Sequence, residues 1–420
     1  MKNIRMFGAA VVLALTARAA SAQLPDASAA GFGMAGNYTA VARGFDAPAF
    51  NPANLGLSQN PAFSLSLLAF GINTGIDPVK LGDVKPFGGK VVPAATKEAW
   101  LQQIGTGRER GGADAGLSIL ALSIRNIGLQ VGLVGTGEVN LNQDAAEAIL
   151  FGNAGRTGSA RAFSFSNSSA SGSAFGVGAV SLAIPISGVE QGQHLSFGVT
   201  GKYIVGLVAG RAMDNGSSVT PDNINVQFPV VYTDSLHVGS AGSGVGVDLG
   251  LAWGDQKTTF SVAAKNVLNT FAWSTDAFKS RPGGFTFDGT NSKSTFVEAP
   301  YSAAPASMRA ALEDEKFKPE IAAGIAHKTG EFLLSADAGQ RIGDGIALGP
   351  KMHVGVGAEF TGIPLLALRG GVAAITQGYQ AAAGLGLHLG WFELGAGVMT
   401  RSRNNNGQEV GAMVSLVGIR

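Results

Sequence analysis

Apolar and small residues alternate over long stretches of this sequence, and this alternation constrains the fold more than any other feature. In residues 244–254 the odd positions hold Val, Leu and Trp, whereas the even positions hold Gly, Asp and Ala. The pattern returns over a longer span from Tyr379 to Trp391, with an aromatic residue at each end of the apolar face. Because successive side chains of a β-strand point to opposite faces, the sequence predicts an all-β fold whose strands have one apolar face.

The face opposite the apolar one distinguishes a membrane barrel from a soluble β-sandwich, whose strands also alternate. In a sandwich this face meets water and is rich in charged residues. Here it is mostly glycine and serine: the chain has 62 glycines in 420 residues and only 14% charged residues, against roughly 25% in soluble domains. We therefore predict a transmembrane antiparallel β-barrel in the cell outer membrane of a Gram-negative bacterium, with the sandwich as the alternative.

The first 22 residues have the pattern of a secretory signal peptide. Lys2 and Arg5 precede an apolar stretch at 7–17, and Ala20-Ser21-Ala22 supplies the small residues of a cleavage site. The apolar stretch is too short to cross a bilayer as a helix. We expect residues 1–22 to be removed and the mature chain to begin at Gln23, the alternative being an uncleaved anchor.

Fourteen strand-length stretches follow, in keeping with the even strand numbers of single-chain bacterial barrels. The predicted strands are 62–72, 113–125, 127–140, 172–187, 192–208, 242–254, 257–268, 318–328, 331–341, 350–361, 364–375, 378–389, 391–400 and 409–419. A fifteenth β-like stretch, 223–233, is assigned to an outer loop, because the short and long connections then alternate. The predicted barrel, 62–420, has long extracellular loops at 73–112, 141–171, 209–241 and 269–317.

A short motif precedes the first strand. It consists of residues 36–42 (Gly-Asn-Tyr-Thr-Ala-Val-Ala), then Asp46-Ala47, then Asn51-Pro52 followed by Ala-Asn-Leu. This motif resembles the N-terminal signature of the FadL-type superfamily, the long-chain fatty-acid transporter and its relatives, and is closest to its uncharacterised, PorV-like or TraF-like branches.

The resemblance implies a barrel of about fourteen strands with an N-terminal plug, here residues 23–61, inside the lumen. It also implies passive transport of small hydrophobic molecules across the outer membrane. The candidate plug residues are Asn37, Asp46, Asn51 and Pro52, of which Asp46, Asn51 and Pro52 are also turn formers. The alternative is that Asn51-Pro52 is only a tight turn leading into the first strand.

Charged residues on the small-residue faces of the strands are expected in the lumen. They are Lys202, Asp248, Lys265, Asp337, Arg341, Glu359 and Glu393. Buried charges of both signs tend to pair, and we predict that Asp248 pairs with Lys265 on the next strand. A paired, rigid interior favours a second function, a non-conducting barrel that acts as scaffold or partner of a secretion, conjugation or surface apparatus.

No catalytic or nucleic-acid-binding chemistry is evident. The five histidines are scattered without metal-ligand spacing, the chain has no cysteine, and no Gly-x-Ser-x-Gly motif occurs. Without Lys2, Arg5 and Arg18, 27 of the 30 basic residues remain against 29 acidic ones, which gives no basic excess for nucleic acid. We expect a non-enzyme without metal or cofactor, whose partners are outer-membrane lipid, a hydrophobic small-molecule ligand or a secretion or surface component.

Overall fold

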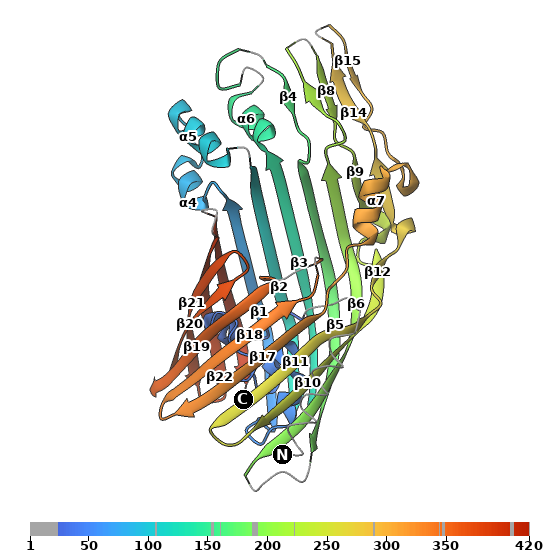
Figure 1. Ribbon diagram of the computed structural model, residues 1–420. Helices are drawn as coiled ribbons and strands as arrows, with labels where there is room; N and C mark the ends of the chain where they lie inside the picture. Colours follow the sequence, from blue (N-terminus) through green and yellow to red (C-terminus); the bar gives the residue numbers. More distant parts are fainter. Residues whose placement is uncertain are drawn as a thin grey trace, which may run out of the picture.

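A closed barrel of fourteen antiparallel strands forms the body of the protein in this computed structural model (Figure 1). The structure describes residues 24–419, except 106, 153–154, 160, 187–191, 222, 289, 344, 347–348 and 404–406. The predicted signal peptide, 1–22, lies outside the described residues. Each wall strand pairs with the next along the chain, and the last pairs with the first, Leu65 opposite Ile419.

The predicted fold class and strand number are confirmed. The wall strands are β1 (Phe63–Asp77), β2 (Arg108–Ile124), β3 (Ile127–Asn142), β5 (Ser169–Ile186), β6 (His194–Met213), β10 (Gly242–Gly254), β11 (Thr258–Asn269), β17 (Glu320–Thr329), β18 (Phe332–Arg341), β19 (Met352–Ile363), β20 (Leu366–Ile375), β21 (Gly378–Leu389), β22 (Phe392–Arg403) and β23 (Gln408–Ile419). The wall is higher on one side, because β6 has 20 residues whereas β18 has 10. Figure 1 shows the long strands rising above the short ones.

Short helices and a second, five-stranded sheet cover the higher side of the barrel mouth (Figure 1). The helical elements are α4 (Leu81–Val84), η4 (Lys85–Phe87), α5 (Ala94–Ile104), α6 (Gln143–Phe151), η5 (Ser235–His237), η6 (Thr275–Ala277), η7 (Tyr301–Ala303) and α7 (Ala306–Glu313). The small sheet contains β4 (Phe163–Ser164), β7 (Ser218–Val219), β8 (Ile224–Gln227), β14 (Gly284–Phe287) and β15 (Ser292–Ser294), while β9 (Val230–Thr233), β12 (Ala272–Trp273), β13 (Phe278–Arg281) and β16 (Ala299–Pro300) extend the wall. Residues 223–233 are therefore not one of the fourteen wall strands.

The outer face of the wall is an apolar belt. Val245 and Leu385 are each 45% exposed on this face, as the alternation predicts. Trp253, Phe260 and Trp391 lie near the turns at one end of the strands, and Tyr379 lies at the opposite end of β21. Such aromatic residues border the hydrocarbon region of membrane barrels. Among the described residues, no helix is long and apolar enough to cross a membrane.

Residues 24–61, here called the plug segment, lie inside the barrel, where Figure 1 draws them in blue. They form α2 (Ala29–Gly33), η2 (Gly44–Asp46), α3 (Ala47–Phe50) and η3 (Pro52–Gly56). The helix α2 packs against β21 and β22, whereas η3 packs against β5, β6 and β10. The plug segment thus contacts opposite parts of the wall with its two halves.

Candidate functional site

Asn37 fixes the first half of the plug segment to the wall. Its side chain is fully buried, and its amide nitrogen donates to the carbonyl oxygen of Val356 at 2.9 Å and to that of Val372 at 3.4 Å. These two residues are direct partners in the pairing of β19 with β20. The carbonyl oxygen of Asn37 also accepts from the hydroxyl of Ser335 at 2.7 Å.

Asn51 makes the same kind of contact for the second half. Its amide nitrogen donates to the carbonyl oxygens of Leu251 at 3.2 Å and Val262 at 3.3 Å, which are partners in the pairing of β10 with β11. Its side-chain oxygen accepts from the backbone N–H of Ala53 at 2.9 Å and so caps η3, which begins at Pro52. Asn51 therefore forms both a turn and a wall contact, while a role in opening the barrel stays a prediction.

Glycines of the wall let the backbone of the plug segment come close. A Cβ atom on Gly198 of β6 would lie 2.2 Å from the nitrogen of Ala53, and one on Gly384 of β21 would lie 2.9 Å from the Cα of Gly33. Real side chains do not tolerate such distances to backbone atoms, so these positions require glycine. The small-residue face of the strands is thus filled by the plug segment.

Two residues that the sequence analysis did not select organise the plug segment itself. Arg43, its only cation, donates to the carbonyl oxygen of Ala42 at 2.9 Å and to the hydroxyl of Thr259 on β11 at 2.9 Å. Asn54 donates to the same carbonyl at 3.0 Å. Asp46, a predicted plug residue, is buried in η2, and its N–H donates to the carbonyl of Arg43 at 3.2 Å. Asn54 belongs to the motif that carries the resemblance, so a signal for it was present.

Lys202 and Asp248 form a buried ion pair between β6 and β10. The Nζ atom lies 2.5 Å from Oδ1 of Asp248, and the two side chains are only 1% and 4% exposed. The same carboxylate oxygen accepts from the backbone N–H of Asn266 at 2.6 Å, and the side-chain oxygen of Asn266 accepts from Lys202. Asn266 thus joins this ion pair from the neighbouring strand β11.

The predicted pair of Asp248 with Lys265 is wrong. The pairing of β10 with β11 contains a bulge opposite Asp248, and Asn266 there has a left-handed backbone with φ of 64°. The bulge brings Asn266 to Asp248. Lys265 instead approaches the neighbouring strand β17, where its Nζ lies 3.7 Å from a carboxylate oxygen of Glu320. Lys265 also lies 5.6 Å from the ring centre of Phe50 in the plug segment.

A second charge cluster joins Glu359 and Glu393 through a residue missing from the predicted set, Arg369. Its Nε lies 2.6 Å from Glu359 on β19, and an Nη atom lies 3.2 Å from Glu393 on β22. The guanidinium reaches Glu393 by passing over Gly386 on the intervening strand β21. Arg369 lies on the small-residue face of β20, so the alternation contained the signal for it.

The remaining predicted lumen charges have different neighbours. A carboxylate oxygen of Asp337 on β18 accepts from the backbone N–H of Thr39 at 3.0 Å, so this residue holds the plug segment. Arg341 lies at the end of β18 near the barrel mouth and donates to the carbonyl of Gly349 at 3.4 Å.

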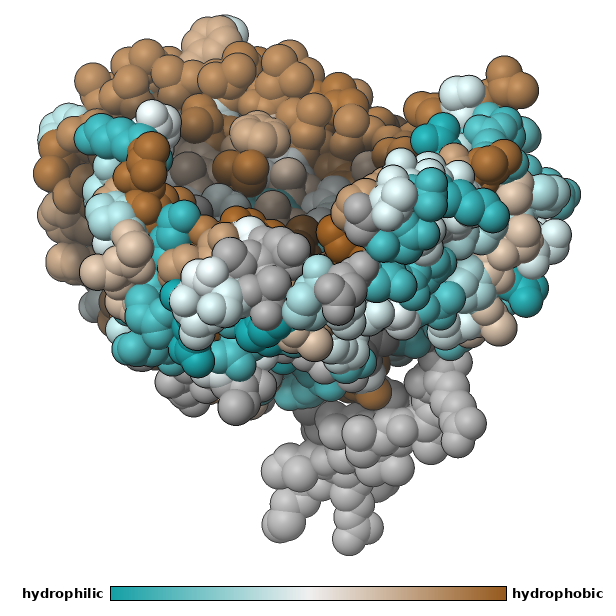
Figure 2. All heavy atoms as spheres, turned by 90° about the horizontal axis from the view of Figure 1, so that it is seen from above, coloured by the Kyte–Doolittle hydropathy of each residue, from teal (hydrophilic) through white to brown (hydrophobic). Residues whose placement is uncertain are grey.

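Two adjoining cavities lead from the mouth to the plug segment, and Figure 2 shows the hollow mouth between the apolar wall and the more polar outer segments. The inner cavity has a volume of about 210 Å³ and the outer one about 340 Å³. Both are lined by Asn73, Asp114, Gly349, Pro350, Lys351 and Arg401.

The inner cavity combines apolar and charged residues. Leu24, Phe32 and Phe50 of the plug segment form apolar parts of its lining. Asp26 also lines it, and burial raises the pKa of this carboxyl group to about 7. Among the described residues no group of three or more His, Asp and Glu side chains is placed to hold a metal ion.

Comparison with known proteins finds solved structures with the same architecture. No protein-family model matches the sequence, and no curated protein matches it. The crystal structure of the toluene transporter TodX from Pseudomonas putida matches with a TM-score of 0.50 and 11% identity, over 94% of this chain and 98% of that one. The CymD monoaromatic hydrocarbon channel matches with a TM-score of 0.50 and 11% identity, over 94% and 96%. This chain has the fold of the FadL-type outer-membrane barrels.

A FadL homologue from Pseudomonas aeruginosa is also among the matches, with a TM-score of 0.46 and 12% identity, over 96% of this chain and 99% of that one. At these identities the likeness concerns the fold. The closed antiparallel barrel and its apolar belt indicate that the protein resides in the outer membrane, as predicted. TodX and CymD are described as a transporter and a channel, not as enzymes.

Proposed function

We propose that this barrel lets small hydrophobic molecules cross the outer membrane by passive diffusion, with the plug segment as a hatch. The observation that carries the proposal is the pair of adjoining cavities from the mouth to the plug segment. The inner cavity offers Leu24, Phe32 and Phe50 of the plug and Met399 and Met413 of the wall to a ligand. Small-molecule sites are mostly apolar with a few polar groups, and this cavity combines its apolar side chains with charged ones such as Lys265 and Asp337.

The way in which the plug segment is held supports the role of a hatch. Its wall contacts include hydrogen bonds, such as those of Asn37 and Asn51, close contacts of backbone with glycine, and small apolar clusters such as that of Phe32 with Met399 and Met413. A hydrogen bond of this kind stabilises by roughly 0.5–1.5 kcal/mol net, so a limited number of contacts has to break for a passage to open. The toluene and monoaromatic-hydrocarbon channels that share the fold suggest the hydrophobic class of the solute.

The second candidate function is a non-conducting barrel that acts as scaffold or partner of a secretion, conjugation or surface apparatus. It is favoured by the tight ion pairs of the lumen, Lys202 with Asp248 and Arg369 with Glu359, which stiffen the interior. In that case the plug segment would stay in place whatever solute is offered.

Disulfide cross-links between plug and wall test the proposal, because the chain has no cysteine of its own. An ideal Cβ on Gly395 of β22 lies 3.2 Å from the Cβ of Ala29 in α2, and one on Gly56 of η3 lies 3.2 Å from the Cβ of Ala183 in β5. Both distances are a few tenths of an ångström short of the ~3.5–4.5 Å that a disulfide spans. The variants are Ala29→Cys/Gly395→Cys for the first half and Gly56→Cys/Ala183→Cys for the second.

The readout is the uptake of a fluorescent phenylnaphthylamine by cells that carry each variant. Under oxidising conditions we expect at least one cross-linked variant to lose most of its uptake, and a reductant to restore it. The single substitutions Ala29→Cys and Gly56→Cys are the matched controls and should not respond. Two outcomes would contradict a transport hatch. Cells with the native protein could take up no more dye than cells without the barrel, or uptake could persist in both cross-linked variants.

A further inference from the structure

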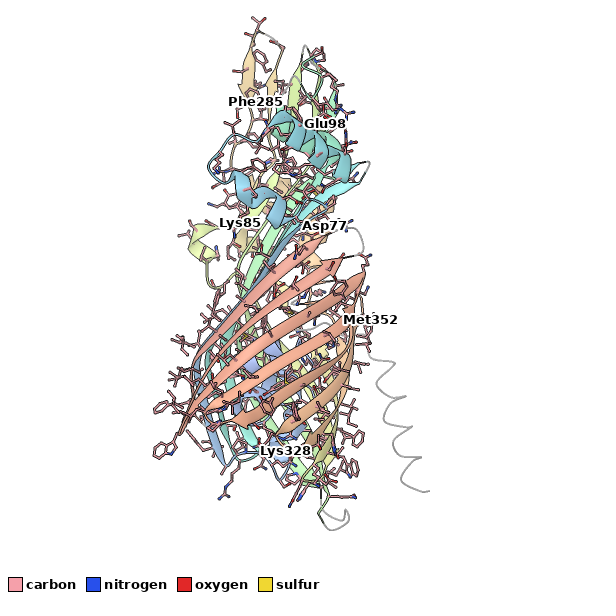
Figure 3. The ribbon with its side chains drawn as sticks, turned by 90° about the vertical axis from the view of Figure 1, so that its left-hand side faces the viewer. Asp77, Lys85, Glu98, Phe285, Lys328 and Met352 are labelled. Carbon is pink, nitrogen blue, oxygen red and sulfur yellow. The ribbon has the colours of Figure 1, made fainter. Side chains whose placement is uncertain are left out.

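The outer face of the wall carries an apolar groove that crosses eight strands, from Leu195 at the start of β6 to β21, and its volume is about 1670 Å³. Strand pairing arranges the outward residues of the groove in two neighbouring rows. The first row is Trp253, Phe260, Ile325, Ala336, Val356, Val372 and Ala381, and the second is Leu251, Val262, Ala323, Ala338, Val354, Ala374 and Tyr379. Figure 3 looks onto the strongly tilted strands of this side, with Lys328 near the lower end of β17 and Met352 at the upper end of β19.

Side-chain size explains the depression. Alanine occupies both row positions on β18, Ala336 and Ala338, so the middle of the groove has a low floor. At one end Trp253 and Phe260 stand against each other with ring centres 5.3 Å apart. At the other end Tyr379 is 61% exposed. The groove thus runs between the aromatic residues of the two ends of the strands.

We propose that this groove binds an acyl chain of an outer-membrane lipid along its length. The groove is continuous with the apolar belt that faces the membrane, and inside the hydrocarbon region there is no water to fill it. A chain lying in it touches side chains on several sides, whereas a chain on a convex wall touches them on one. Because dispersion attraction adds up over such contacts, the groove retains a lipid that the rest of the belt exchanges.

The groove is long enough to hold an extended acyl chain. The seven strands from β10 to β21, about 4.8 Å apart, span about 29 Å, and the rows run at right angles to strands that tilt by about 35–45°. The groove therefore rises by about 17–20 Å through the membrane, which is somewhat more than one leaflet, or half, of a hydrocarbon core about 30 Å thick.

The plug segment braces the groove from inside the barrel. Asn37 bonds the carbonyl oxygens of Val356 and Val372, and Asn51 bonds those of Leu251 and Val262. All four wall residues line the groove on the lipid side. The wall is thus held in shape behind the groove, and a preformed site costs less to order on binding.

The test fills the floor with larger apolar side chains. The variant Ala336→Leu/Ala338→Leu changes only residues that face lipid, so the barrel should fold, which heat-modifiable gel mobility checks. The matched control is Ala396→Leu/Ala412→Leu, whose outward alanines on β22 and β23 lie outside the groove. Each protein is extracted from membranes, washed with detergent and weighed by native mass spectrometry to count the phospholipid or lipopolysaccharide molecules retained.

We expect the native barrel and the control to retain at least one lipid, and the filled variant to retain several-fold less. A second readout is quenching of Trp253 fluorescence by phospholipids with brominated acyl chains, in a Trp391→Phe background, and it should fall only in the filled variant. A native barrel without lipid, equal retention in the filled variant, or the loss of a second protein copy instead of a lipid would overturn the proposal. Lipid retention does not depend on solute uptake, so this result and that of the disulfide test stand separately.

Discussion

The ion pair of Lys202 with Asp248 offers the sharpest test of the lumen geometry. Both side chains are almost fully buried, at 2.5 Å from each other, so removing one leaves an uncompensated charge away from water. Such a loss costs about 3–5 kcal/mol, whereas removal of both charges costs far less. We therefore expect Lys202→Met and Asp248→Asn each to cost about 3–5 kcal/mol, and the double variant less than either, because the asparagine can still accept from the backbone N–H of Asn266.

The measurement is urea unfolding of the barrel in lipid vesicles, followed by tryptophan fluorescence. Independent substitutions add to within about 0.3–0.5 kcal/mol, so the coupling expected for Lys202 and Asp248 is well outside that range. The matched cycle uses Lys265→Met with Asp248→Asn, since Lys265 lies 3.7 Å from Glu320 instead and is partly exposed. Additive losses in the first cycle, or a larger coupling in the second, would refute the assignment of partners.

Two further predictions concern the lipid face and the outer segments. Leu385→Arg, in the middle of β21, should lower the free energy of unfolding by about 2–4 kcal/mol in the same assay. The control Leu385→Ala keeps the lipid face apolar and should cost clearly less. Equal losses would speak against the assigned face. The hydrogen bond from Arg161 lowers the pKa of Glu147 in α6 below its usual 4.5, so its stabilisation is present above that value and disappears as the pH falls below it. Hydrogen-exchange protection of α6, corrected for the intrinsic rate, should therefore fall as the pH is lowered below 4.5, and Glu147→Gln should abolish that dependence. Protection that is independent of pH in the native chain would exclude this role.

The sequence predicts the wall well because membrane and lumen impose opposite demands on successive residues. It predicts strand ends less well where a strand leaves the membrane. The strand β2 begins at Arg108 and β6 continues to Met213, beyond the ranges 113–125 and 192–208 expected from alternation. Outside the hydrocarbon region both faces of a strand can meet water, so the apolar period that marks the strand is lost although the pairing continues.

Partners within the lumen depend on register, which the sequence does not reveal at a bulge. One irregularity in the pairing of β10 with β11, together with the left-handed Asn266, decides whether Asp248 meets Lys265 or Lys202. The alternation marks Asp248, Lys202 and Lys265 as lumen charges. It does not reveal which of them are neighbours, because shifting one strand by two residues leaves the alternation unchanged. Arg369 shows the same limit, since its face was readable while its two partners on β19 and β22 were not.

The contacts of the plug segment explain why its motif can be recognised in the sequence, whereas the wall residues that it contacts cannot. Asn37 and Asn51 bond carbonyl oxygens, which every residue of a strand supplies, and the side chains of Val356 and Leu251 at these positions face lipid. The wall therefore needs only small residues on its inner face, such as Gly198, to admit the plug backbone. Because the contact rests on amides of the plug and backbone of the wall, it does not depend on which apolar side chains the wall strands carry towards lipid, whereas replacing either asparagine removes it. The short Asn-containing motif is thus the part of the sequence from which the plug contacts can be recognised.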